Sequence, residues 1–246
     1  MLLGIIKVDQ SVAYSNKAVI LFLLFVILGY SVGCGKKTKE EYYPDGKLKA
    51  VYTYNAAGLL DGAAKKYYPR GKLQSEETYK NNVREGKAKK YYESGQLNTE
   101  VNWKNGNPEG MATGYYESGK LQDERNYKGG KLEGIRKIYY EDGKLQEEVN
   151  YKEGKQDGID KTYYENGKLA VDGNWRDGKL EGIAKTYYEN GKLGVDGNWK
   201  NGNPEGMATS YYENGNVKVQ GEWKDNIVMW KRCYDEQGNT IQCPKE

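Results

Sequence analysis

The strongest constraint on the fold is a pair of tyrosines that returns at a nearly fixed interval. The phrase "YYENGKL" stands at residues 187–193, and close variants of it recur through most of the 246 residues. The pair begins at eight positions, separated by one step of 25 residues and then six steps of 24: Tyr42, Tyr67, Tyr91, Tyr115, Tyr139, Tyr163, Tyr187 and Tyr211. A period of this length indicates a tandem repeat array, in which each unit stacks on its neighbours.

Two glycine positions in each unit predict turns. The first follows the tyrosine pair in phrases such as "ENG", which ends at Gly191, and such dipeptides favour two-residue hairpin turns with positive φ. The second lies further along the unit, as at Gly202, and Asn82 and Asn226 replace it in two units. Asparagine is the residue that best tolerates the same conformation after glycine. Each unit is therefore predicted to be a β-hairpin, joined by a second turn to the next hairpin.

Cross-strand pairs test the register of these hairpins. With Asn190 and Gly191 at the turn centre, Lys185 lies opposite Asp196. The same register places opposite charges together in four other units: Lys65 with Glu76, Lys89 with Glu100, Lys137 with Glu148, and Lys161 with Asp172. On the other face it pairs Tyr188 with Leu193, Thr186 with Val195, Ala184 with Gly197, and Gly182 with Trp199. Opposite charges that face each other five times support this register.

A third glycine series lies across the strand pair from aromatic rings. Its members are Gly86, Gly110, Gly134, Gly158, Gly182 and Gly206. Because a ring can cover a missing side chain, we expect each ring to pack over the glycine opposite. Such contacts contribute roughly 0.2–1 kcal/mol each, so the array is expected to be stable only as a whole.

The predicted fold is all-β: an elongated single-layer antiparallel β-sheet of about eight tandem 24-residue hairpins. Eight hairpins supply about sixteen strands, which at roughly 4.8 Å per strand extend about 75–80 Å. A single layer leaves a stripe of aromatic side chains partly exposed, and such a stripe usually marks an interaction surface. The candidate binding ladder comprises Tyr92, Trp103, Tyr116, Tyr127, Tyr140, Tyr151, Tyr164, Trp175, Tyr188, Trp199, Tyr212 and Trp223.

Composition argues against catalysis. The chain has no histidine, and therefore lacks the usual general base and the commonest metal ligand. The recurrent glutamates Glu93, Glu117, Glu141, Glu165, Glu189 and Glu213 share one turn position, so no carboxylate pair stands out as acid and base. The net charge of +3 makes no case for nucleic-acid binding. We expect no enzyme activity, no catalytic residues, no metal site, no cofactor and no nucleic-acid partner.

Residues 1–33 have the features of an export signal or membrane anchor. Residues 18–33 carry no charge, follow Lys17, and are short for a permanent membrane span. Cys34 directly after Gly33 resembles the bacterial lipobox, in which the cysteine receives a lipid and becomes the mature N-terminus. The alternative is an uncleaved anchor. Either version tethers the repeats through a polar linker, residues 34–41, in the bacterial cell envelope outside the cytoplasm.

The C-terminal segment reads as a broken half-repeat. The repeat array spans residues 42–232, and residues 233–246 are expected to cap it. Cys233 and Cys243 lie within the sequence "RCYDEQGNTIQC" and can pair in an oxidising compartment. The alternative is two free thiols. A cap closed by a disulfide would protect an exposed sheet edge.

The unit "YYENGKLGVDGNWKNGNPEGMATS" at residues 187–210 resembles the bacterial MORN-repeat variant, which occurs in proteins of the YwqK-like antitoxin family. "YKGGKLEGIRKIYYEDGKL" at residues 127–145 carries the same elements, and the resemblance covers residues 42 to about 232. It implies a MORN-like antiparallel sheet and a binding role without enzyme activity.

We therefore expect a membrane-tethered repeat scaffold that binds a protein partner in the envelope, an envelope component or a toxin in an immunity-like role. One alternative is a cytoplasmic antitoxin of the YwqK-like type. Another is a glycan-binding or choline-binding module, because tyrosine and tryptophan rings can stack on sugars or enclose quaternary ammonium groups.

The lipid assignment can be tested by intact mass. We expect the protein made in a bacterial host to begin at a lipid-modified Cys34, and Cys34→Ala to remain unprocessed. Globomycin, which blocks lipoprotein signal peptidase, should give the wild-type chain the same unprocessed mass. A full-length wild-type chain without lipid in untreated cells would contradict the assignment.

Overall fold

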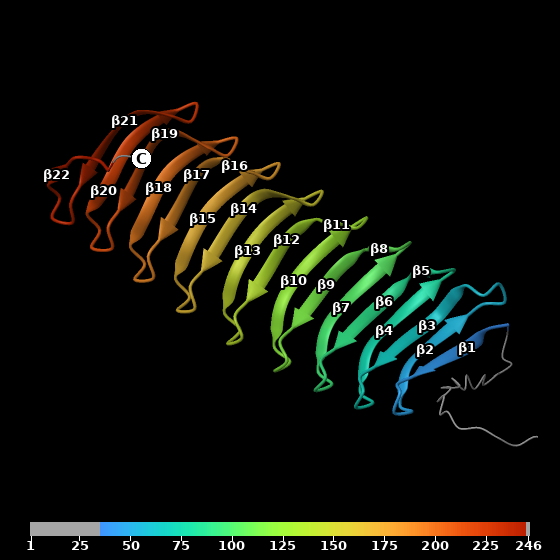
Figure 1. Cartoon of the computed structure of the whole chain (residues 1–246). Helices are drawn as coiled ribbons and strands as arrows, with labels where there is room; N and C mark the ends of the chain where they lie inside the picture. The colour runs from blue at the N-terminus through green and yellow to red at the C-terminus, as the bar shows by residue number, and fades with distance from the viewer. Residues whose placement is uncertain (1–34, 245–246) are drawn as a thin grey trace, which may run out of the picture.

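A computed structural model describes residues 35–244 as one open antiparallel β-sheet of 22 strands. The strands follow chain order from β1 at one end to β22 at the other (Figure 1). Each pairs with its neighbours, except that β5, β8, β11 and β16 pair only with the strand before them and continue into the strand after them. No helix occurs in this part of the chain. The predicted all-β, single-layer hairpin array is confirmed.

The strands have the following bounds. The first half of the sheet contains β1 (Lys37–Tyr42), β2 (Leu48–Tyr54), β3 (Leu60–Tyr67), β4 (Leu73–Lys80), β5 (Val83–Arg84), β6 (Gly86–Tyr91), β7 (Leu97–Lys104), β8 (Asn107–Pro108), β9 (Gly110–Tyr115), β10 (Leu121–Lys128) and β11 (Lys131–Leu132). The second half contains β12 (Gly134–Tyr139), β13 (Leu145–Lys152), β14 (Lys155–Tyr163), β15 (Leu169–Arg176), β16 (Lys179–Leu180), β17 (Gly182–Tyr187), β18 (Leu193–Lys200), β19 (Asn203–Tyr211), β20 (Val217–Lys224), β21 (Ile227–Tyr234) and β22 (Thr240–Ile241).

The excess over sixteen strands has two causes. In four units the first strand of the hairpin is interrupted at a glutamate, which separates β5 from β6, β8 from β9, β11 from β12, and β16 from β17. In addition, β21 and β22 form a ninth hairpin beyond the eight predicted ones.

The turn after the tyrosine pair is a three-residue loop, and the prediction of a two-residue turn there is wrong. The Tyr188 carbonyl accepts from the Gly191 N–H at 2.7 Å, and the Tyr188 N–H donates to the Lys192 carbonyl at 2.8 Å. Only Gly191 of these residues has a positive φ, at 92°. A type I turn followed by a left-handed glycine is the usual three-residue hairpin connection.

A β-bulge beside this loop restores the predicted register. Tyr187 lies opposite Leu193, which is one residue out of step, and Gly194 is the extra residue on its strand. From Thr186 opposite Val195 onward, every predicted pair is present, including Gly182 opposite Trp199. The loop and the bulge shift the register by one residue in opposite directions, so the only wrong pair is Tyr188 with Leu193.

The other turn is the two-residue one. Asn201 and Gly202 have φ of 54° and 84°, between the paired residues Lys200 and Asn203. Positive φ at both central residues defines the type I′ turn, which matches the right-handed twist of the flanking strands. The first central residue is left-handed in seven such turns: Asn81, Asn105, Gly129, Glu153, Asp177, Asn201 and Asp225.

Tyrosine hydroxyls join each unit to the next at the three-residue loops. The second tyrosine of a pair donates to the backbone carbonyl of the first tyrosine in the following unit, at 2.6–2.9 Å. This tyrosine ladder contains eight bonds: Tyr43 to Tyr67, Tyr68 to Tyr91, Tyr92 to Tyr115, Tyr116 to Tyr139, Tyr140 to Tyr163, Tyr164 to Tyr187, Tyr188 to Tyr211, and Tyr212 to Tyr234. The ladder ties adjacent hairpins together through the residue pair that defines the repeat.

Carboxylates join the units at the two-residue turns. Glu181 accepts a hydrogen bond at 2.8 Å from the N–H of Asn201, the first residue of the next turn. Five other units have the same bond: Glu85 with Asn105, Glu109 with Gly129, Glu133 with Glu153, Asp157 with Asp177, and Glu205 with Asp225. Both ends of most hairpins are therefore fixed to the next hairpin.

Glycines of the third series are not covered by rings, contrary to expectation. Gly182 does lie opposite Trp199, but a Cβ added there would meet open space. Its φ of 79° explains the glycine instead, because β-bulges often need a left-handed residue. The ring of Trp199 covers Gly197 on its own strand, where an added Cβ would lie 2.8 Å from the ring.

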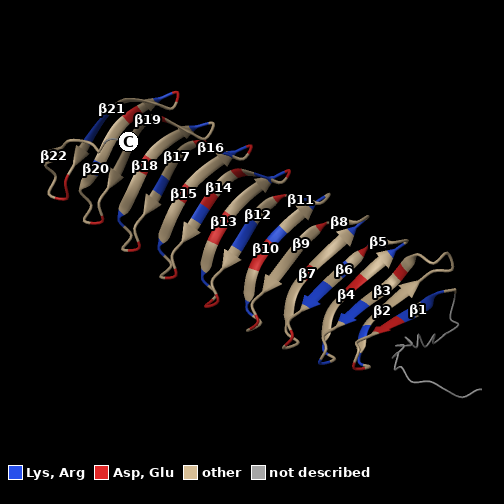
Figure 2. Ribbon diagram, in the orientation of Figure 1, with Lys and Arg blue, Asp and Glu red and all other residues tan. Residues whose placement is uncertain are grey.

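Charged pairs lie along the middle of the strands, where Figure 2 shows lysines beside acidic residues. Ion pairs of 3.1–3.8 Å join four predicted partners: Lys65 with Glu76, Lys89 with Glu100, Lys137 with Glu148, and Lys185 with Asp196. The fifth pair, Lys161 and Asp172, has the predicted register. These side chains are partly exposed, so each pair contributes only about 0–1 kcal/mol.

The N-terminal end of the array differs from expectation, and the C-terminal hairpin departs from the repeat pattern. Residues 37–41, placed in the linker by the sequence, belong to β1 and pair with β2. At the other end, Asp235 takes the position of the second tyrosine and makes the same turn bonds without a hydroxyl to donate. The tyrosine ladder therefore stops at Tyr234.

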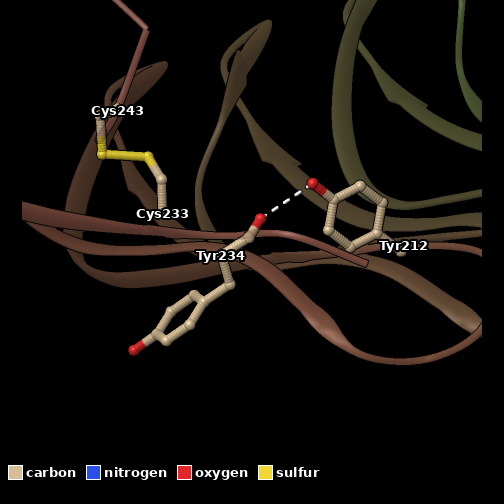
Figure 3. Close-up of a disulfide and its surroundings, with 4 residues drawn as sticks. All are labelled: Tyr212, Cys233, Tyr234 and Cys243. Atoms are coloured by element: carbon tan, nitrogen blue, oxygen red, sulfur yellow. Dashed lines mark hydrogen bonds between the residues drawn. A yellow bond between two sulfur atoms is a disulfide. The ribbon is translucent and has the colours of Figure 1, made fainter. Parts of the chain in front are cut away.

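A disulfide closes the last hairpin. Cys233 and Cys243 are bonded, with 5.2 Å between their Cα atoms (Figure 3). Cys233 is buried at 4% exposure, and Figure 3 shows the bond near the last step of the tyrosine ladder, from Tyr212 to Tyr234. The disulfide holds the residues after β22 against β21.

Removal of one ladder hydroxyl should weaken the array. Tyr164→Phe loses the 2.6 Å bond to the Tyr187 carbonyl, so we expect a loss of about 1 kcal/mol in the free energy of urea unfolding. Tyr163→Phe is the control, since its hydroxyl makes no hydrogen bond within residues 35–244. Equal losses in both variants would contradict a stabilising ladder.

Loss of the disulfide should loosen only the last hairpin. The chain-entropy estimate for a ten-residue separation is about 2–3 kcal/mol, and contacts in a repeat array reach only neighbouring units. We expect Cys243→Ser to speed amide hydrogen exchange in β21 and β22, and to leave β3–β15 unchanged. Reduction of the wild-type protein should reproduce the pattern, whereas global unfolding would contradict it.

Candidate functional site

Strand alternation gives the sheet two chemically different faces. The aromatic face is defined in one unit by Gly182, Ala184 and Thr186 on β17 and Val195, Gly197 and Trp199 on β18. The aliphatic face is defined by Ile183 and Lys185 on β17 and Asp196 and Asn198 on β18. Successive residues of a strand point to opposite faces, so these sets recur in each unit.

The predicted binding ladder divides into two rows of half-buried rings. One row holds the second tyrosines, whose hydroxyls are used within the tyrosine ladder: Tyr92, Tyr116, Tyr140, Tyr164, Tyr188 and Tyr212. The other row lies near the two-residue turns: Trp103, Tyr127, Tyr151, Trp175, Trp199 and Trp223. Several of its members also have contacts inside the protein, such as the Arg84 guanidinium 4.7 Å from the Trp103 ring centre. The structure thus gives many of these rings a structural role.

The most exposed periodic apolar residues lie on the aliphatic face. Five consecutive units carry an aliphatic side chain directly after the third glycine, with exposures of 38–64%. This aliphatic stripe comprises Met111, Ile135, Ile159, Ile183 and Met207. This stripe was not predicted from the sequence, because the aromatic residues were taken as the exposed apolar surface. The signal was present in the recurring "EGM", "EGI" and "DGI" triplets.

Acidic residues accompany the stripe. Each stripe residue comes two positions after the carboxylate that accepts from the next turn, as Met207 follows Glu205. An open hollow of about 540 Å³ lies between two stripe residues and is lined by Ile183, Met207, Asp196, Glu205 and Tyr211, among others. Two carboxylates and no cationic side chain line this hollow.

Thr209 gives this hollow one lysine fewer than the corresponding positions of the two preceding units. Thr209 lies beside Asp196, at the position that Lys185 and Lys161 occupy in the preceding units. Asp196 keeps one ion pair, at 3.5 Å to Lys185 on its other side. The hollow therefore combines apolar walls with an acidic floor.

Ion pairs gather on the aromatic face in the first half of the array. Arg84 lies 3.1 Å from Glu77, and Arg125 lies 2.7 Å from Asp123, which is only 9% exposed. In later units the position of Arg84 holds proline, leucine or glutamine, and the position of Arg125 holds valine or glycine. A second hollow of about 220 Å³ lies here, lined by residues that include Arg84, Trp103 and Arg125. Two rings of the predicted ladder, Trp103 and Tyr127, line this hollow together with charged side chains.

Asp160 is a half-buried acid on the aromatic face. Burial raises the pKa of its carboxyl group, and the hydrogen bond donated by the Trp175 indole at 2.9 Å opposes that rise. Burial is the larger effect, so the pKa of the Asp160 carboxyl group is raised above its usual value.

Neither a cluster of potential metal ligands nor a membrane-spanning helix occurs among the described residues. Within residues 35–244, histidine, cysteine and acidic side chains form no group of three that could hold a metal ion. That range also contains no helix long and apolar enough to cross a bilayer. Cys34 and residues 1–33, which carry the predicted lipid and signal, lie outside the described residues.

The fold and the hydrogen bonds repeated between units define a class of protein: a non-globular array of antiparallel hairpins. One face of the array carries apolar side chains at the interval of the repeat. Eight segments match the MORN repeat variant model: residues 38–56, 60–81, 84–105, 108–128, 132–153, 156–177, 180–201 and 204–225. They cover well over half of the chain, which therefore belongs to the MORN repeat variant family. Each family unit spans one hairpin, and every unit after the first ends at or next to a two-residue turn. The first begins inside the predicted linker.

Other comparisons add little. Curated proteins give no match. Three solved structures are similar over part of their length: "Crystal Structure of TcdB2-TccC3-Cdc42" (12% identity, TM-score 0.21), "Crystal Structure of TcdB2-TccC3-TEV" (14%, 0.21) and "Crystal Structure of TcdB2-TccC3" (13%, 0.20). They match 80%, 84% and 83% of this chain, which spans only 14%, 15% and 15% of theirs. Scores this low carry no argument about function.

Neutralising Asp160 should stabilise the protein at neutral pH. Because folding raises the pKa of this carboxyl group, its charged form disfavours the folded state above that pKa, and the cost disappears below the unfolded value of about 3.9. We expect Asp160→Asn to be more stable at pH 7, by less than about 1 kcal/mol, and indistinguishable from wild type near pH 3. Thermal unfolding at both pH values measures this. A stability gain that persists at pH 3 would contradict it.

Proposed function

We propose that the protein is a non-enzymatic scaffold, tethered in the bacterial cell envelope, that binds an extended protein partner along the aliphatic stripe. The observation that carries this proposal is the stripe itself, with five exposed aliphatic side chains in register along one face. Exposed apolar surface of this regularity costs solubility and has no part in the hydrogen bonds that hold the units together. A binding role accounts for it.

The energetics suit a linear contact. Full burial of one such side chain contributes roughly 1.5–3 kcal/mol, so half-exposed residues contribute about 1 kcal/mol each when covered. Five of them together suffice for a specific contact when the partner covers the whole stripe. The neighbouring lysine–acid pairs satisfy one another, so they steer the partner without dominating its affinity.

The tether rests on the N-terminal sequence. A lipid on Cys34 would hold the sheet at a membrane with β1 nearest the surface. In that setting the partner is an envelope component, or a toxin in an immunity-like role. An unprocessed Cys34 would favour the cytoplasmic antitoxin reading of the same scaffold.

A second candidate is a small-ligand module on the aromatic face. The 220 Å³ hollow beside Arg84, Trp103 and Arg125 supports it, because aromatic and polar groups converge there. Two facts rank it lower: Arg84 already covers one face of Trp103, and both arginines are paired with acids. A glycan or choline-type ligand would have to displace these contacts.

Removal of two stripe residues should weaken binding of the partner. We expect a photo-reactive phenylalanine derivative at Ile135 to crosslink the partner in intact envelopes, and Ile159→Ser with Ile183→Ser to reduce the yield. Loss of about 2 kcal/mol predicts roughly thirtyfold weaker binding. Thr162→Ala with Thr186→Ala is the matched control, on the same strands but the opposite face. Equal crosslinking in the stripe and control variants would overturn the proposal.

A further inference from the structure

The spacing of the stripe restricts what can bind along it. Consecutive stripe residues belong to consecutive units, and each unit contributes two strands to the sheet. With about 4.8 Å between strands, stripe residues recur at about 9.6 Å. A partner that contacts all five must present an apolar side chain at nearly the same interval on one side of its backbone.

Polyproline II geometry matches this interval. It has three residues per turn and a rise of 3.1 Å, so every third side chain returns to the same side after about 9.3 Å. Over the four steps from Met111 to Met207, the mismatch with the stripe is only about 1.2 Å.

Other backbones fit less well. A β-strand turns every third side chain to the opposite side, because its side chains alternate. Two turns of an α-helix, at 1.5 Å per residue over seven residues, advance about 10.5 Å, which accumulates an error of about 3.6 Å over the same four steps. The stripe therefore selects a partner in polyproline II conformation.

The acidic hollow indicates the charge that the partner carries. Asp196 and Glu205 line the space between Ile183 and Met207, and no cationic side chain lines it. With three residues per turn, the residue next to an anchor lies about 120° around the helix, so only a long side chain there reaches this space from beside the apolar row. A lysine or arginine there would meet the two carboxylates, with its methylene groups against the apolar walls.

We propose that the aliphatic stripe receives a basic polypeptide segment in polyproline II conformation, with an apolar side chain at every third residue and a lysine or arginine in the hollow between Ile183 and Met207. This proposal rests on the proposed function, since it uses the same stripe. It adds the backbone, the period and the charge of the partner.

Three labelled peptides test period and charge separately by fluorescence anisotropy with the full chain in detergent. The first, (Leu-Pro-Lys)5, has both the matching period and the matching charge. The second, (Leu-Pro-Lys-Ser)5, keeps five leucines and five lysines but lengthens the period, and (Leu-Pro-Glu)5 reverses the charge. We expect the first to bind at least tenfold more tightly than either of the others. Equal binding of the second overturns the period, and equal binding of the third overturns the charge.

Thr209→Lys locates the basic side chain. The substitution places lysine beside Asp196, as Lys185 lies beside Asp172 in the preceding unit, so the array already accommodates it. We expect at least threefold weaker binding of (Leu-Pro-Lys)5. Thr186→Lys on the opposite face is the control and should change the affinity by less than twofold. Unchanged binding by Thr209→Lys overturns the hollow as the site of the charge.

The envelope crosslinking experiment separates this proposal from the proposed function. If no peptide binds but the stripe variants still lose crosslinking, the stripe has a protein partner of another conformation, and only the present proposal fails. If crosslinking is also unaffected, both fail.

Discussion

The hydrogen bond from a tyrosine hydroxyl to the first tyrosine carbonyl of the next unit is the interaction on which the array depends. Small side chains such as Ala50, Ala112 and Val149 make up the buried set, so the described sheet has no thick apolar core. Stability must then come from links between neighbours, and the ladder supplies one at nearly every step. This explains why tyrosine outnumbers phenylalanine by 24 to two, since phenylalanine cannot donate.

Because the array depends on the tyrosine ladder, side chains with a structural role can be distinguished from side chains that are free to contact a partner. Half of the predicted binding ladder donates its hydroxyls within the sheet, and the remaining rings lie close to their own strands, as Trp199 does over Gly197. The aliphatic stripe makes no comparable contact and can be covered without disturbing the array. The proposed binding surface and rings such as Trp199 therefore lie on opposite faces of one layer.

Strand register and fold class could be predicted from the sequence because repeated charge pairs report which residues face each other. The turn types could not, since "ENG" satisfies both a two-residue turn and a three-residue loop with a left-handed glycine. The bulge at Gly194 restores the register, so the predicted pairs beyond it are correct although the turn type is wrong. The stripe was missed because its members are single apolar residues among charges, and only the bulge before them shows which face they occupy.

The two ends of the tyrosine ladder are not equivalent. In every unit after the first, the backbone carbonyl of the first tyrosine accepts a hydrogen bond from the preceding unit, and the Tyr42 carbonyl is the equivalent acceptor of the first unit. At the other end, Asp235 stands where a tyrosine would have to donate to a further unit. Two copies placed end to end would therefore meet without the bond that joins units inside the chain, and the disulfide-closed hairpin would lie between them. The last hairpin therefore blocks end-to-end association of two copies. The array can lengthen by internal duplication, as the two copies of "NWKNGNPEGMAT" indicate, without forming a fibre.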